Sequence, residues 1–113
     1  EDYATYIPSR VVVLTLPLIS TKILKYFNLI EKTFSDGRKY ESPNSGISEA
    51  IFAHIANIQL GGENKYKEQK IFKPLLNYTG NKCNRDSIMQ ICNLIIRLEL
   101  LWISVYSLIL FLN

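Results

Sequence analysis

The sequence ISEAIFAHIANIQLGGENKYKEQKIFK, residues 47–73, carries the strongest structural signal in this chain of 113 residues. Its first half predicts a helix with one buried stripe, because isoleucines recur there at helical spacing: Ile47, Ile51, Ile55 and Ile58. Asn44 and Ser45 precede this helix as N-cap candidates. Gly61 and Gly62 follow it as the predicted stop.

Lysines interleaved with aromatic residues follow the two glycines: Lys65, Tyr66, Lys67, Lys70, Phe72 and Lys73. On a short helix, cations at this spacing can meet phosphates, while the aromatic rings pack inward or stack on bases. A solvated basic face on an ordinary helix is the alternative, and it is the more frequent use of such a run.

The composition indicates a globular chain, with 48% hydrophobic and 20% charged residues. Its length allows one domain or a piece of one. The net charge of +3 favours an anionic partner only weakly, since so small an excess bears mainly on solubility. The missing initial Met and the apolar end suggest an incomplete chain, and the acidic start argues against a signal peptide.

The remaining segments also favour helices. The run Val11–Leu16 suits a buried strand or a helix that Pro17 would kink, whereas the apolar spacing from Ser20 to Ile30 predicts a helix. Residues 35–46 and 77–84 are loops by composition. Ser87 and Gln90 have capping-box spacing and open a final helix. We therefore expect an all-α fold of four to five helices, divided into a helical domain, 1–94, and an apolar helix or run-on tail, 95–113.

The uncharged run Leu100–Leu112 raises the question of a membrane anchor. Its 13 residues fall short of the roughly twenty that a spanning helix needs. Extension back to Ile88 reaches that length but takes in Arg97 and Glu99. A buried core helix or a run-on tail is favoured. A small helical protein that uses residues 100–112 to anchor in a membrane or to dock on a partner remains the alternative.

The sequence offers no recognisable catalytic constellation. His54, the single histidine, falls within the isoleucine stripe, where a hydrogen-bonded core histidine is more common than a general base. Phosphate-binding glycine motifs are missing, and Cys83 and Cys92 lack the spacing of a metal site. We therefore expect no enzyme activity, no catalytic residues, no metal and no cofactor.

Several pieces of the chain, taken in order, resemble the amino-terminal half of bornavirus nucleoproteins, including endogenous bornavirus-like copies in animal genomes. The pieces are Pro8-Ser9 with the apolar run Val11–Leu18, the helix Gly46–His54, the basic stretch Lys65–Lys73 and the helix start Ser87–Asn93. The loop before Ile47 is shorter than in the family, and the carboxy-terminal lobe is missing. Such departures fit a decayed or host-retained copy.

The resemblance implies an incomplete, all-helical N-terminal lobe that self-associates and binds single-stranded RNA by its backbone, weakly when alone. Lys70 and Lys73 would occupy RNA-facing positions, and Lys65 and Lys67 match the family less closely. Its partners would be single-stranded RNA and viral nucleoprotein or a second copy, with a membrane less favoured. Its location would be the nucleus or cytoplasm, or the virion nucleocapsid if the chain is viral.

Overall fold

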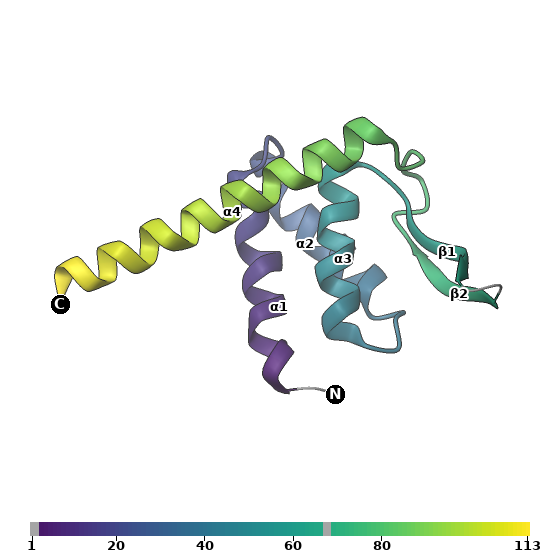
Figure 1. Cartoon of the computed structure of the whole chain (residues 1–113), viewed down its shortest axis with the longest axis horizontal. Coiled ribbons are helices and arrows are strands. Elements are labelled where there is room, and N and C mark those ends of the chain that lie inside the picture. Colours follow the sequence, from purple (N-terminus) through teal and green to yellow (C-terminus); the bar gives the residue numbers. More distant parts are fainter. Residues whose placement is uncertain (1–2, 67–68) are drawn as a thin grey trace.

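A computed structural model describes residues 3–66 and 69–113. Three helices pack side by side, a hairpin lies at one side of them, and a long helix crosses the end of the bundle (Figure 1). Within the described residues the elements are α1 (Tyr3–Thr15), η1 (Leu16–Ile19), η2 (Ile23–Lys25), α2 (Tyr26–Gly37), α3 (Pro43–Ala56), β1 (Leu60–Tyr66), β2 (Gln69–Leu76) and α4 (Arg85–Leu112).

The ambiguous run Val11–Leu16 is helical up to Thr15, where α1 gives way to the 3₁₀ turn η1. Pro17 lies in the first turn of η1, and it cannot donate the backbone hydrogen bond that would continue an α-helix. Val13 and Leu16 are fully buried against α3. Tertiary packing thus selects helix for a β-branched run that would also suit a strand.

Two glycines bring α2 and α3 close together. A Cβ on Gly37 would lie 2.6 Å from the Cα of Ile47, and a Cβ on Gly46 would collide with the carbonyl oxygen of Gly37. Neither position has room for a larger residue. This approach buries the isoleucine stripe of α3 against α1 and α2.

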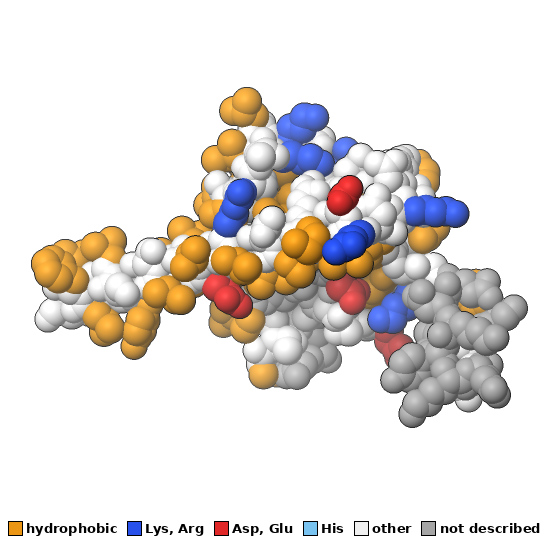
Figure 2. Space-filling view, turned by 45° about the horizontal axis from the view of Figure 1, so that its top comes forward, with side chains coloured by type: hydrophobic (Ala, Val, Ile, Leu, Met, Phe, Trp, Pro, Cys, Tyr) orange, Lys and Arg blue, Asp and Glu red, His pale blue; other side chains and the backbone are white. Residues whose placement is uncertain are grey.

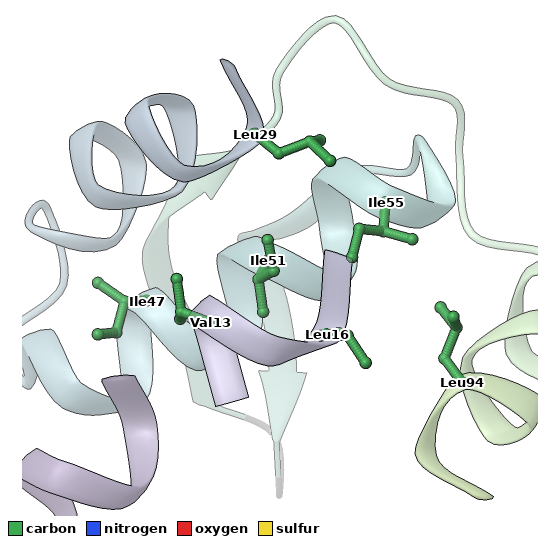
Figure 3. Packing of buried hydrophobic residues seen from close by; sticks show 7 residues of the cluster. All are labelled: Val13, Leu16, Leu29, Ile47, Ile51, Ile55 and Leu94. Carbon is green, nitrogen blue, oxygen red and sulfur yellow. The ribbon is translucent and has the colours of Figure 1, made fainter. Parts of the chain in front are cut away.

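The main core draws residues from α1, η1, α2, α3 and α4 (Figure 3). Its buried members are Val13, Leu16, Leu29, Ile47, Ile51, Ile55 and Leu94. Burying aliphatic side chains of this size stabilises the fold by about 1.5–3 kcal/mol each. The predicted stripe of α3 is therefore confirmed for Ile47, Ile51 and Ile55.

The lysine-rich stretch does not form a helix, which corrects the expected all-α fold to a mostly helical one. The described residues contain four α-helices and a two-stranded antiparallel hairpin, β1–β2. Helix α3 ends before the glycines, at Ala56, and the C-cap residue Asn57 adopts the left-handed conformation. Gly61 and Gly62 have positive φ angles of 88° and 80° and lie at a bulge in the ladder. Because these φ values suit glycine at a β-bulge, the glycines shape the start of β1 rather than stop a helix.

Helix α4 begins one turn earlier than the capping pattern indicated. The side chain of Asn84 accepts a hydrogen bond of 2.9 Å from the backbone N–H of Ser87, so Asn84 is the N-cap. Ser87 and Leu94 are buried on the bundle, whereas most of the second half of α4 is exposed. The expectation of a buried core helix over residues 100–112 is therefore wrong. The boundary between 94 and 95 falls inside α4, and the two-part division stays a prediction.

Candidate functional site

The first turn of α3 lies between two cavities. One, of about 410 Å³, opens toward α1 and is lined by Thr5, Pro8, Ser9, Val12, Ser42, Asn44, Ser45 and Ser48. The other, of about 320 Å³, opens toward β2 and is lined by Tyr40, Glu41, Ser42, Ser45, Phe72, Lys73 and Pro74. Both cavities share Ser42 and Ser45, so one helix end with its hydroxyl groups serves both.

Arg10 ties α1 to this helix end. Its Nη1 donates to Asn44 Oδ1 at 2.7 Å and to Ser9 Oγ at 3.2 Å, and both of these side chains line the first cavity. Asn44 in turn donates from Nδ2 to Thr5 Oγ1 at 2.9 Å. The guanidinium also lies over the Tyr6 ring, with Cζ 3.5 Å from the ring centroid. These contacts hold a permanent positive charge beside the cavity.

The backbone of α3 adds to this positive field. Pro43 occupies its first turn, and the side chain of the N-cap residue, Ser42, makes no capping hydrogen bond within the described part of the chain. A helix N-terminus carries roughly half a positive charge from the aligned peptide dipoles. The hydroxyl of Ser42 therefore remains available to a bound group.

Lys73 supplies a cation on the other side. Its Nζ lies 5.5 Å from the centroid of the Tyr40 ring, and its side chain is exposed at the second cavity. Burial, followed by the negative charge of Glu49, raises the pKa of the Tyr40 phenol above its ordinary value of 10.0. Tyr40 is thus a neutral ring over which an ammonium group can rest.

These groups surround the first turn of α3 with donors suited to an anion. A helix N-terminus, an arginine, a lysine and several hydroxyl groups are the donors that bind phosphate or carboxylate oxygens in proteins. Glu41 also lines the second cavity, where its negative charge would oppose a bound anion. No group of three or more metal-ligating side chains occurs among the described residues.

The predicted RNA-binding lysines are placed differently from one another. Lys65 and Lys70 are partners in the hairpin ladder, and their side chains lie outside the described part. Lys67 lies outside the described residues altogether. Lys73, the one of these four lysines whose side chain is described, lines a cavity with other polar groups.

A second polar cluster joins α2, α3 and the turn after β2. Asp36 Oδ2 lies 2.7 Å from His54 Nε2 and accepts a hydrogen bond of 2.9 Å from the backbone N–H of Asn77. Lys39 Nζ contacts Asp36 Oδ1 at 3.3 Å. The Asn77 side chain donates to the carbonyl oxygens of Ala53 and Ile58. The interpretation of His54 as a hydrogen-bonded core histidine is confirmed, since its exposed fraction is only 9%.

Both titratable members of this cluster have lowered pKa values. Burial raises the pKa of Asp36, but hydrogen bonds from Asn77, His54 and Lys39 outweigh it, so the net pKa lies below the ordinary 3.8. Burial lowers the pKa of His54 below 6.5, although Asp36 opposes this effect. The pair neighbours a cavity of about 370 Å³, but its atoms are engaged in holding three elements together. We regard it as structural.

Sequence reasoning missed Arg10 as a site residue and assigned Asn44 only to a helix cap. Their 2.7 Å contact joins residues 34 positions apart, a separation that no local pattern reveals. The one available signal was Ser-Pro-Asn-Ser at residues 42–45, a hydroxyl- and amide-rich start for a helix.

Comparisons with known proteins give a consistent result. A protein-family model described as CobD/Cbib protein matches residues 1–95. The cobalamin biosynthesis protein CobD of Synechocystis is 45% identical over 76 residues, which cover 67% of this chain and 21% of that protein. CobD of Leptospira interrogans is 34% identical over 110 residues, covering 96% of this chain and 35% of that protein. CobD of Brucella anthropi is 36% identical over 93 residues, which cover 78% of this chain and 28% of that protein.

The chain therefore spans about a third or less of the length of these curated relatives. No solved structure matches it.

These matches overturn the bornavirus resemblance and what it implied. A viral nucleoprotein fragment, single-stranded RNA and nucleoprotein as partners, and a nuclear, cytoplasmic or virion location are all contradicted. The expectation of no enzyme activity is also wrong, because the matching family works in cobalamin biosynthesis. The resemblance rested on short apolar and basic segments. Unrelated helical proteins share such segments, because a helix in any of them buries apolar side chains on one face and exposes charged ones on the other.

Proposed function

This chain belongs to the CobD/Cbib protein family, and we propose on that basis that it forms part of a membrane enzyme of cobalamin biosynthesis, acting in the synthesis of adenosylcobinamide phosphate. The observation that carries the proposal is the family match over residues 1–95. This range includes α1 to β2 and the packed start of α4. The whole bundle, with the site at the first turn of α3, thus lies within the match.

Helix α4 supports attachment to a membrane. It is the one helix, within the part of the chain that the structure describes, that is long and apolar enough to cross a bilayer. Residues 95–112 would extend about 27 Å at 1.5 Å per residue, close to the ~30 Å hydrocarbon core, with Arg97 and Glu99 near the beginning of this stretch. Hydrophobic side chains cover this free part of α4 where it projects from the body (Figure 2). The membrane-anchored alternative for residues 100–112 is therefore the one we adopt.

The site at the first turn of α3 is our candidate for contact with substrate. A phosphate or carboxylate there would lie at the positive end of α3, with Lys73 lining the second cavity. Arg10 would act from behind the Ser9 and Asn44 side chains that line the first cavity. Arginine binds such groups through paired N–H donors, whereas lysine acts as a point charge. We assign Arg10 to orienting the anionic group and Lys73 to attracting it.

A chimeric protein tests this function directly. The matching segment of Synechocystis CobD is replaced by this chain and expressed in a bacterium that lacks its own CobD and requires cobalamin. We expect growth without added cobalamin, and adenosylcobinamide phosphate detectable by mass spectrometry. A chimera that is folded and membrane-bound but makes no product would contradict the proposal.

Variants of the same chimera test the site. Arg10→Ala combined with Lys73→Ala should lower product formation, whereas Arg38→Ala should not, because Arg38 is an exposed arginine at the end of α2. Full activity in the double variant would remove the anion site while leaving membership of the pathway intact.

A further inference from the structure

Helix α1 carries an apolar stripe that the bundle leaves uncovered. Tyr3, Ile7 and Leu14 are 92%, 68% and 45% exposed, and Val11 between them is half-buried. We call these four residues the outer stripe. At 100° per residue they fall within an arc of about 80° on one side of the helix. Ser9, Val13 and the following Leu16 are buried on a different side, against the core.

The outer stripe is also separate from the candidate substrate site. Thr5, Pro8, Ser9 and Val12 line the cavity beside α3, and on the same helical projection they occupy a different arc from the stripe. Arg10, the one charged residue of α1, projects beside Tyr3 at the edge of the stripe, and its guanidinium is bonded to Asn44. The stripe is therefore an uncharged surface about three turns long.

The position of α1 relates this surface to α4. Helix α4 crosses the carboxyl end of α1, where Leu94 joins Leu16 in the core. Its free half then projects past α1, on the side away from α3 (Figure 1). Since α1 packs on α3 through its buried side, its outer side faces the region into which α4 projects.

The segment from η2 into the first turn of α2 has the composition of a membrane contact. Leu24 and Phe27 are 99% and 85% exposed, and Lys25 is exposed between them. Exposed apolar side chains interleaved with lysine suit the boundary between acyl chains and anionic head groups. A second copy of the chain would gain nothing from such a lysine unless it offered an acidic surface there.

We propose that the outer stripe of α1 lies against the bilayer surface, so that α1 is an interfacial helix at the foot of the spanning helix α4. The occupant of this face is lipid, with anionic head groups near Lys25. The proposal rests on the proposed function, because it requires α4 to be inserted. Under this proposal, the helical bundle contacts the membrane through α1 as well as through α4.

Single-site fluorescent labelling of the full chain in lipid vesicles tests this arrangement. Cys83 and Cys92, both free and exposed, are replaced by serine, and one cysteine at a time is introduced. The stripe is probed by Ile7→Cys and Leu14→Cys, α4 by Ile103→Cys, and the exposed loop before α4 by Lys82→Cys. Each cysteine carries an environment-sensitive dye in vesicles of phosphatidylcholine and phosphatidylglycerol.

We expect the dyes at positions 7 and 14 to be quenched by nitroxide-labelled lipid and protected from aqueous iodide, as at position 103. The dye at position 82 should behave in the opposite way. If position 103 is quenched by lipid nitroxide but positions 7 and 14 are quenched by iodide, the stripe faces water and the inference fails while the spanning helix stands. Protection from both quenchers would mean that protein covers the stripe, which also overturns the inference. If lipid nitroxide does not quench the dye at position 103, the proposal that α4 spans the membrane is contradicted.

Discussion

The guanidinium Nη1 of Arg10 lies 2.7 Å from Oδ1 of Asn44, and this hydrogen bond joins the middle of α1 to the first turn of α3. Asn44 is 2% exposed, so the bond is formed at a protected position and is charge-assisted. It places a cation beside a hydroxyl-lined cavity. The same contact serves the fold and the proposed site, so the two roles must be separated by experiment.

Replacing Arg10 should damage activity in a way that lysine does not repair. Hydrogen bonds to charged groups contribute about 1.5–3 kcal/mol, so Arg10→Ala should lower kcat/KM of the chimera roughly tenfold to hundredfold. Arg10→Lys keeps the charge but loses the fork that reaches both Asn44 and a substrate oxygen. Product formation measures the effect, and thermal unfolding reports any loss of stability. Restoration of full activity by lysine would limit the role of Arg10 to its charge.

Gly46→Ala should destabilise the chain, although alanine is the better helix former. Helix propensity alone favours alanine by about 1 kcal/mol. The new Cβ would collide with the Gly37 carbonyl oxygen and lie 2.9 Å from Cβ of Tyr40, and overpacking of this kind costs about 1–3 kcal/mol. Urea unfolding followed by circular dichroism in detergent measures the difference. Ser45→Ala, at the exposed neighbouring position, is the control and should change stability far less.

Stability should fall as the pH drops below neutrality, and His54 is one cause. Its pKa is below 6.5 in the folded chain, so between that lowered pKa and 6.5 the unfolded chain binds more protons. The free energy of unfolding therefore rises with pH across this window. Asp36 acts in the same direction at lower pH, since its stabilising contribution is lost as the pH falls from 3.8 through its lowered pKa.

A His54→Gln variant separates these two contributions. It should flatten the pH dependence of stability just below pH 6.5. The loss at lower pH, which belongs to Asp36, should persist but be smaller, because contact with His54 is one of the causes that lower the pKa of Asp36. Unfolding midpoints in urea at a series of pH values measure both parts. An unchanged slope in the variant would show that His54 does not titrate with unfolding.

A charge in the free half of α4 should release the chain from membranes. Arginine near the centre of a spanning helix costs about 2.5–3.5 kcal/mol, so Ile103→Arg together with Ile109→Arg should shift the chain out of the carbonate-resistant membrane fraction. Gln90→Arg, at an exposed position in the packed half, is the matched control and should remain membrane-bound. Membrane retention of the double variant would argue that α4 does not span.

Parts of the fold were predictable because their signals are local. Residues 47, 51 and 55 recur at helical spacing, and the structure buries them on one side of α3. The final helix was also expected, although Asn84, not Ser87, caps it. The hairpin was missed because lysines and aromatics at irregular spacing were read with a helical period. The two glycines were read as a helix stop, while their positive φ angles mark a bulge.

The family was missed for a different reason. Short apolar and basic segments recur in unrelated proteins, so their order along one chain discriminates poorly. A family match over residues 1–95 combines weak amino-acid preferences at many positions. Only this combination distinguishes one family from another.

By itself, the sequence determined that this chain is mostly helical, that the isoleucines of α3 face a core, and that it ends in an apolar helix. These properties follow from periodicity and hydropathy, which act within a few turns. Only the tertiary structure decided that Arg10 meets Asn44, that α2 and α3 touch at Gly37 and Gly46, and that the described part of the chain leaves most of the second half of α4 exposed. The physical reason is that each of these depends on how separate elements pack, and packing brings together residues whose spacing along the chain carries no period.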